Sequence, residues 1–169
     1  MKLNNLCPLP EIEKVFAFYS IKGVSGYSCD CDPDLACATK INNNKNSIVI
    51  CRPLLKKLDE LDFEWTVLHE LSHINNKDID CNYDNLPDEI KFQKEVDADR
   101  TASKMQYEKR KKNYGIYTLQ KMIWVLGDFN IAHFLNNNEY LSRKLGLEKR
   151  MNILRSYKDI YSPDIGINI

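Results

Sequence analysis

The strongest constraint on the fold is a ten-residue apolar stretch that contains two histidines and a glutamate. Residues 65–74 read Trp-Thr-Val-Leu-His-Glu-Leu-Ser-His-Ile, and the apolar side chains are not confined to one helical face. A helix that is apolar on more than one side is buried among other elements. Buried imidazole and carboxylate groups need polar partners, because removing them from water costs free energy. The chain must therefore fold around this helix and supply partners for its polar residues.

The polar residues of this stretch form the motif His-Glu-x-x-His. His69 and His73 are spaced i and i+4, so they project from the same side of a helix, one turn apart. Their imidazoles can share one tetrahedral zinc ion at about 2.0–2.1 Å. Glu70 can reach a water molecule on such a metal and act as general base in peptide-bond hydrolysis. The alternative is a pair of structural histidines with ordinary partners in the core.

A second acidic motif follows on the next predicted helix. Glu95, Ala98, Asp99 and Ala102 are spaced i, i+3, i+4 and i+7, so they share one face, and the alanines allow close approach. A catalytic zinc needs a third protein ligand and an open fourth position. We expect Glu95 to be that ligand and Asp99 to accept the N–H of a metal-bound histidine, which fixes the ring orientation. Asp97 and Asp99 are alternative third ligands, because aspartate also binds zinc.

The two motifs together resemble a known class of metallopeptidases. HExxH followed by Glu95-x-x-Ala98-Asp99 is similar to the gluzincin pattern of the neprilysin family and of the membrane peptidases that process CAAX proteins. In size and layout the chain resembles the small ImmA/IrrE group and the Lit-type phage-exclusion peptidases, which act on a few protein partners. The resemblance covers residues 65–102. It implies a zincin-like fold, one zinc on His69, His73 and Glu95, and Asp99 as the histidine's partner.

A peptidase also needs a group that stabilises the oxyanion of the tetrahedral intermediate. His133 is the one further histidine of the chain, and it falls in a predicted helix over residues 117–135. We expect His133 to be this catalytic group, with Tyr107, Tyr114 and Tyr117 as competitors. The alternative for His133 is a structural role, since a single histidine on an apolar helix often has one.

The remaining pattern predicts an α+β fold that is mostly helical. The short β-branched run at residues 47–51 predicts a strand in a small N-terminal sheet, and residues 21–38, with two glycines and a proline, predict loops. We expect a single zincin-like domain over residues 1–169, built around the buried HExxH helix. Helical spacing of apolar residues predicts helices over residues 9–20, 54–74 with a break near 59–62, 88–112, 117–135 and 139–157.

The composition argues against some partners. The chain carries 24 Lys and Arg against 24 Asp and Glu, so no net charge draws it toward nucleic acid or an acidic membrane. The basic run 109–112 suits a solvated helix end. The first residues lack the apolar core of a secretory signal, and no later run could span a bilayer. We therefore expect a cytoplasmic protein with protein or peptide partners; the sequence does not give its oligomeric state.

Six cysteines leave their own question open. Cys29, Cys31 and Cys37 lie within nine residues, but their spacing matches no standard zinc knuckle. We expect these cysteines to be buried or loop residues in reduced form. The alternatives are a second, structural zinc at this cluster, or disulfides in an exported, toxin-like peptidase.

The function predicted from these observations is a zinc-dependent endopeptidase. Because the chain is small, we expect a cleft for a narrow set of protein substrates, in which an extended peptide pairs with the strand at residues 48–50. The Lys-, Asn- and Ile-rich composition is typical of an AT-rich bacterial or phage genome. The alternative hypothesis is a non-catalytic zinc-binding module that uses the same scaffold to bind a protein partner; the intact Glu70 argues against it.

Overall fold

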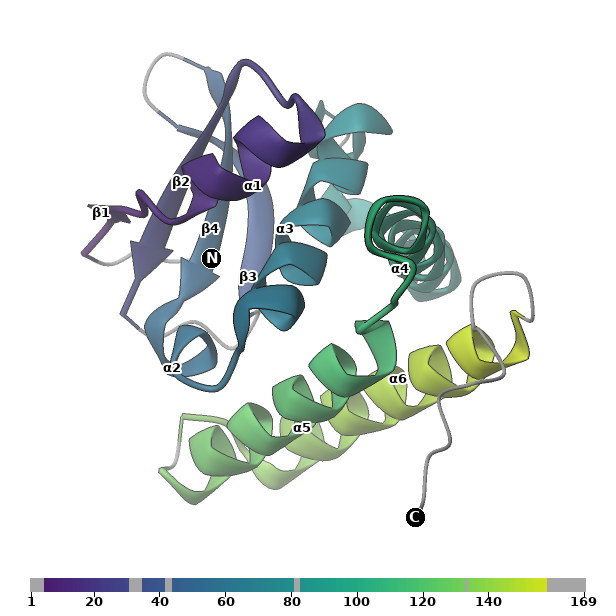
Figure 1. Cartoon of the computed structure of the whole chain (residues 1–169). Coiled ribbons are helices and arrows are strands. Elements are labelled where there is room, and N and C mark those ends of the chain that lie inside the picture. Colours follow the sequence, from purple (N-terminus) through teal and green to yellow (C-terminus); the bar gives the residue numbers. More distant parts are fainter. Residues whose placement is uncertain (1–4, 31–34, 42–43, 81–82, 133, 158–169) are drawn as a thin grey trace.

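The computed structural model describes residues 5–30, 35–41, 44–80, 83–132 and 134–157 (Figure 1). Within them the fold is α+β and mostly helical, with a small sheet near the N-terminus, as predicted. The elements in chain order are β1 (Cys7–Pro8), α1 (Ile12–Tyr19), β2 (Val24–Cys29), β3 (Ala36–Ile41), β4 (Lys45–Cys51), α2 (Arg52–Leu55), α3 (Glu60–Asn75), the short 3-10 helices η1 (Asp78–Asp80) and η2 (Tyr83–Asn85), α4 (Asp88–Arg110), α5 (Gly115–Ile131) and α6 (Asn137–Ser156). No helix among these residues is long and apolar enough to cross a membrane.

The sheet is larger than the sequence predicts. Its described strands are ordered β1-β2-β4-β3, with β2 and β4 parallel and the other neighbours antiparallel. The expectation of loops over residues 21–38 is therefore wrong, because β2 and the first part of β3 fall in this region. The predicted strand is confirmed as β4, which lies inside the sheet between β2 and β3.

Gly26 explains why β2 was taken for a loop. It lies within β2 and pairs with Ile48 of β4, so it is not a turn residue. A Cβ atom at this position would lie 3.0 Å from the Cβ of Ile12 and closer still to the methyl groups of that side chain. The glycine thus allows α1 to pack directly on the sheet, a role that sequence alone does not distinguish from a turn.

The central helix, α3, begins at a well-formed cap. The carboxylate of Asp59 accepts hydrogen bonds from the backbone N–H groups of Leu61 and Asp62, and the Asp62 carboxylate accepts from the N–H of Asp59. This cap separates α3 from α2 and accounts for the break expected near residues 59–62. The fully buried Asp62 also pairs with Thr118 and Lys121, which joins α3 to α5.

A second buried carboxylate joins α3 to α1 and α4. Glu64 accepts hydrogen bonds from Arg110 of α4, with Nη2 to Oε2 at 2.7 Å, and from the hydroxyl of Tyr19 of α1 at 2.8 Å. Gln106 donates to the carbonyl of Leu61 at 2.8 Å. The first half of α3 is therefore held on three sides by polar contacts in which each carboxylate has a cation of its own.

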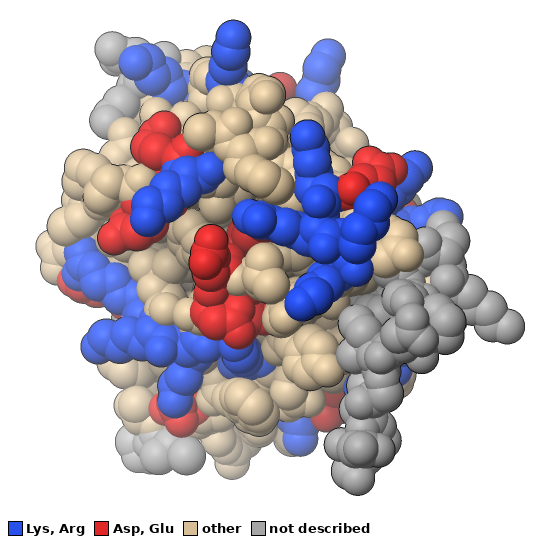
Figure 2. Space-filling model, in the orientation of Figure 1, with Lys and Arg blue, Asp and Glu red and all other residues tan. Residues whose placement is uncertain are grey.

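The helices are arranged around α3. Figure 1 shows the sheet and α1 on one side of α3, α4 on the other, and the antiparallel pair α5 and α6 below them. Charges of both signs are interspersed on the face in Figure 2, and basic side chains gather near the C-terminal end of α4. Lys109, Lys111 and Lys112 are exposed there, as predicted for a solvated helix end.

Candidate metal centre

The HExxH residues occupy the second half of α3, and Glu95 faces them from α4. His69, Glu70 and His73 are all buried, with 3%, 5% and 7% of their surface exposed. The two helices approach closely because Ala98 and Ala102, which have no exposed surface, lie on the contact face. The predicted faces of both helices therefore meet.

Three groups converge on one point between the helices. The Nε2 atoms of His69 and His73 are 3.2 Å apart, and the two carboxylate oxygens of Glu95 lie 3.4 Å from them, one from each. In a tetrahedral zinc site with bonds of about 2.0–2.1 Å, neighbouring ligand atoms are about 3.3–3.4 Å apart. Among the described residues, these three form a group able to hold a metal ion.

The other ring nitrogens show which way the imidazoles are protonated. The Nδ1 atom of His73 lies 2.9 Å from Asp78 Oδ2. The Nδ1 atom of His69 lies 2.9 Å from Asp99 Oδ1, at ion-pair distance although the N–H is not aligned on that oxygen. A nearby carboxylate favours the tautomer with the proton on Nδ1, and in a neutral ring of this kind Nε2 keeps its lone pair. Both lone pairs and the Glu95 carboxylate then point at the same position, an arrangement that suits a metal ion.

Arg150 of α6 holds the two acidic residues of α4. Its Nε and Nη2 atoms donate to the two oxygens of Asp99 at 2.7 and 2.6 Å, and its Nη1 donates to Glu95 Oε2 at 2.9 Å. Burial opposes the charge of Asp99 and Glu95, but Arg150 and the histidines outweigh it and hold the pKa of both carboxyl groups below its usual range. Both groups are therefore anionic.

The charges around the described site suit a bound divalent metal. Glu70, Glu95, Asp78 and Asp99 are the carboxylates, and the cations beside them are Arg150 and Lys94, which pairs with Asp78. With both imidazoles neutral, as metal ligands are, and all four carboxylates ionised, the described cluster carries two excess negative charges, which one divalent cation would neutralise. A buried cluster with uncompensated charge is costly. The donor set, its spacing and its charge all fit a divalent metal ion.

Glu70 is not among the three converging groups. It lines the cleft beside the histidines, and its burial raises the pKa of its carboxyl group above the usual value. A carboxylate with a raised pKa is a better proton acceptor than an ordinary one. This position fits the general base predicted for Glu70.

The metal position opens into a cleft of about 650 Å³. One wall is formed by β3 and the other by α5 and α6; the residues that line it include Leu35, Ala36, Ala38, Thr39, Met122, Leu126, Gly146 and Leu147. Tyr83 of η2 also lines the cleft, and its hydroxyl donates to Glu95 Oε1 at 3.0 Å. Burial and the neighbouring Glu95 raise the pKa of Tyr83, so its O–H proton is retained.

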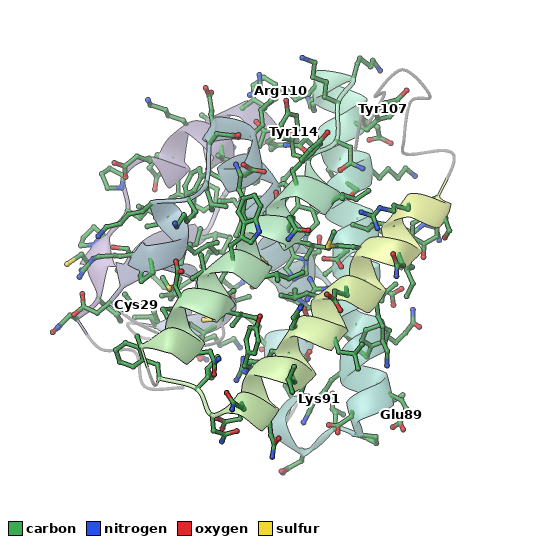
Figure 3. All side chains as sticks on the ribbon, turned by 90° about the horizontal axis from the view of Figure 1, so that it is seen from below. Cys29, Glu89, Lys91, Tyr107, Arg110 and Tyr114 are labelled. Carbon is green, nitrogen blue, oxygen red and sulfur yellow. The ribbon has the colours of Figure 1, made fainter. Side chains whose placement is uncertain are left out.

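Several predicted residues lie elsewhere. Asp97, the rival third ligand, is exposed and accepts a hydrogen bond from Gln93. His133 lies outside the described residues. Tyr107 and Tyr114 lie toward the end of α4 opposite Glu89 and Lys91, as Figure 3 shows, and the described cleft lining includes neither of them nor Tyr117. The prediction that one of these three tyrosines stabilises the oxyanion is therefore wrong. Tyr107, for example, lies about 18 Å beyond Glu95 along the helix.

The strand at the cleft also differs from the prediction. β4, with residues 48–50, is bonded to a strand on both sides, so it has no edge to offer a peptide. The strand beside the cleft is β3, which lies at the edge of the described sheet. The expectation placed the edge on the most apolar strand, and apolar strands are the ones that the sheet buries.

Of the predicted zinc-binding cysteines, Cys31 lies outside the described residues. Cys29 is buried at the end of β2 and Cys37 lies in β3.

Three residues of the site were not found from the sequence. Asp78 and Tyr83 lie in the segment between the two motifs, which has no periodicity from which their orientation could be predicted. Arg150 did leave a trace, because it shares the apolar face of α6 with Leu147 and Leu154. A charged residue on a buried face requires partners of opposite charge elsewhere in the fold.

Comparison with protein-family models, curated proteins and solved structures gave no match, so the site is interpreted from its own geometry.

We predict that Arg150→Leu destabilises the metal-free protein and weakens zinc binding. The substitution leaves Asp99, which is 1% exposed, without its bidentate partner, and breaking a buried ion pair costs about 3–5 kcal/mol. Because Asp99 orients His69, zinc affinity should fall about 10- to 100-fold. Urea unfolding of chelator-treated protein and a competitive zinc titration measure the two effects. Arg155→Leu, at an exposed position on the same helix, is the control, and equal behaviour of the two variants would contradict the assignment.

We also predict that zinc uptake releases a proton from His69. In the metal-free site burial lowers the pKa of His69, but Asp99 and Glu95 outweigh it and raise the pKa to about 10. Since a metal-bound imidazole is neutral, zinc binding at about pH 8 should displace one proton, and this release should vanish as the pH rises through about 10. Calorimetric titration in buffers of different ionisation enthalpy counts the protons. Using Glu70→Gln removes that carboxyl group from the count, and zero release at about pH 8 would refute the assignment.

Proposed function

We propose that the protein is a zinc-dependent endopeptidase that cleaves a narrow set of protein substrates. The observation that supports this most directly is the convergence of His69 Nε2, His73 Nε2 and the Glu95 carboxylate at 3.2–3.4 Å, with Glu70 beside them in an open cleft. Two imidazoles and one carboxylate are a common zinc ligand set in peptidases and leave a fourth position for water or substrate. Zinc is therefore favoured over harder cations, which prefer oxygen ligands alone.

The residues of the site can perform the steps of hydrolysis. A bound zinc ion would lower the pKa of a water molecule and polarise the scissile carbonyl group. Glu70 takes a proton from the attacking water as its oxygen bonds to the carbonyl carbon, and gives that proton to the leaving nitrogen as the C–N bond breaks. Its raised pKa suits both transfers. Asp78 and Asp99 keep the two imidazoles in the required orientation.

The edge of β3 supports binding of an extended peptide. Residues 36–39 of β3 line the same cleft as His69, Glu70 and His73. An extended chain that pairs with a sheet edge is held through its backbone, whatever its sequence. Side-chain pockets must then select the substrate, which suits an enzyme with few targets.

We predict that wild-type protein and Glu70→Gln each bind about one zinc ion, whereas His73→Ala binds little. Glu70 is not one of the converging ligands, so its loss should leave the metal and remove cleavage, by about 10²–10⁴-fold for a general base. The measurements are zinc content per chain and cleavage of a synthetic randomised peptide library, followed by mass spectrometry.

The outcomes separate the hypotheses. Equal zinc in all three proteins would place the metal away from His73 and contradict the site. Zinc bound as predicted, with no more cleavage by wild type than by Glu70→Gln, would instead favour a non-catalytic zinc-binding module.

We predict that Tyr83→Phe lowers kcat about 10²–10³-fold without loss of zinc. The Tyr83 hydroxyl lies in the cleft beside Glu95. An O–H donor in this position can stabilise the developing oxyanion, which is the role first expected for His133. Tyr114→Phe is the matched control, since Tyr114 lies outside the cleft lining. An unchanged kcat in Tyr83→Phe would exclude this role.

A further inference from the structure

Positive charge is concentrated at the C-terminal end of α4. In Figure 2, which has the orientation of Figure 1, Lys and Arg side chains are grouped around the position of this helix end. Residues 104–112 contain five cations and one acidic residue, Glu108. The chain as a whole has 24 basic and 24 acidic residues, so this excess is local. The cations are Lys104, Lys109, Arg110, Lys111 and Lys112.

Three of these cations form what we call the basic surface. Lys109, Lys111 and Lys112 are exposed, and no carboxylate of the described residues forms an ion pair with them. Arg110 differs, because it is bound to the buried Glu64. The basic surface therefore presents ammonium groups whose charge is not neutralised within the described part of the chain.

The helix dipole explains only part of this charge. Cations in the last turn interact favourably with the negative end of a helix, which accounts for Lys109 and Arg110. Lys111 is the C-cap residue, and its φ of 57° lies in the left-handed region where glycine is most often found. Any other residue costs backbone strain there. A strained lysine at this position supports a function for its side chain.

Two aromatic rings lie beside the lysines. The Nζ atom of Lys111 is 6.0 Å from the centre of the Tyr107 ring, and that of Lys109 is 5.9 Å from the centre of the Phe18 ring of α1. Phe18 is 42% exposed, and Figure 3 shows Tyr107 at the same end of the molecule as Arg110. Rings at this distance attract the ammonium groups and offer apolar surface next to them. A partner could thus bury apolar area and pair its charges in one place.

The basic surface is separate from the cleft. Its three lysines and the two rings are not among the described residues that line the cleft. Lys109 lies 14 residues beyond Glu95 on α4, which is about 21 Å along the helix. An extended peptide advances about 3.3 Å per residue, so at least about six residues would separate a group bound here from the scissile bond.

We infer that the basic surface binds an acidic segment of a protein substrate. Its role in substrate binding rests on the proposed peptidase function. Three ammonium groups match a short run of Asp or Glu, whereas a protein bound to nucleic acid neutralises about 6–10 phosphates. With no net charge, the chain also lacks the long-range attraction for a nucleic acid. A second contact outside the cleft strengthens the binding of those few proteins that carry both sequences.

The binding test uses two fluorescein-labelled peptides of about twelve residues with the zinc-loaded Glu70→Gln protein, which should not cleave them. One peptide has a run of about four Glu residues next to a Phe, and the other has Gln in place of each Glu. Fluorescence anisotropy should show at least about tenfold tighter binding of the Glu peptide, and the difference should shrink as salt is added. Equal binding of the two peptides at low salt would overturn the inference.

Charge reversal locates the binding surface. In the first triple variant all three lysines of the basic surface are changed to Glu, and the preference for the Glu peptide should disappear. A second triple variant makes the same change in net charge at exposed lysines elsewhere and should keep the preference. An equal loss in both variants would show a response to net charge alone and would overturn the inference. The control positions are Lys45, Lys56 and Lys149.

Lys111→Gly separates the charge of this residue from its effect on the fold. The change removes one ammonium group and relieves the left-handed backbone strain. We expect about two- to fivefold weaker binding of the Glu peptide, with a free energy of unfolding in urea that is unchanged or higher. Weaker binding together with lower stability would indicate a structural role for Lys111 and contradict its assignment to the basic surface.

A nucleic acid is the competing partner. A single-stranded oligothymidylate with the same number of negative charges as the Glu peptide serves as the probe. We expect it to bind more weakly than the Glu peptide, because it lacks the apolar Phe side chain. Tighter binding of the oligonucleotide, lost in the first triple variant, would assign the surface to nucleic acid and overturn the choice of an acidic polypeptide.

Cleavage by wild-type protein separates this inference from the proposed function. For a cleaved peptide extended by about six or more residues to a run of Glu, KM should be about tenfold lower than with Gln, with kcat unchanged. The first triple variant should lose this difference. Cleavage with no effect of the Glu run would overturn the role of the surface and leave the peptidase function. Lysine-dependent binding without any cleavage would leave the surface and overturn the peptidase function.

Discussion

The buried charges around His69 and His73 determine how the helices of this protein meet. Each imidazole has one nitrogen beside a carboxylate, from η1 for His73 and from α4 for His69, and the other nitrogen faces Glu95. Arg150 then links α6 to the carboxylates of Glu95 and Asp99. Any of these elements could move only by leaving a charge buried without its partner, which costs several kcal/mol. The arrangement of α3, α4 and α6 is therefore fixed by electrostatics as much as by apolar packing.

The two halves of α3 show why this cluster differs from an ordinary buried ion pair. In the first half, the buried carboxylates of Asp62 and Glu64 have the side chains of Lys121 and Arg110 as cations, so the protein itself completes each pair. In the second half, when both imidazoles are neutral, the carboxylates outnumber the cations Arg150 and Lys94, and both Nε2 atoms face Glu95. The same helix thus contains complete pairs where the role is structural and an incomplete one where a metal would fit. This contrast supports a metal site more strongly than the motif alone.

The sequence predicted those parts of the site that depend on helical spacing. His69, Glu70, His73, Glu95 and Asp99 came from two helices whose faces follow from periods of three and four residues, and the structure brings them together as expected. Asp78 and Tyr83 lie in an irregular segment, where no period gives the direction of a side chain. Arg150 is 51 residues from Asp99 and meets it only after α5 and α6 have folded back on the core. The order of strands in the sheet is equally non-local, which is why the edge was assigned to β4 rather than β3.

The position of α6 links the metal centre to the wall of the cleft. Arg150 fixes the helix to Glu95 and Asp99, and Gly146 and Leu147 of the same helix line the cleft. A peptide bound in the cleft would therefore contact a helix whose position depends on Glu95 and Asp99. A change that loosened the contact of Arg150 with Asp99 would then disturb both the candidate metal site and this wall of the cleft.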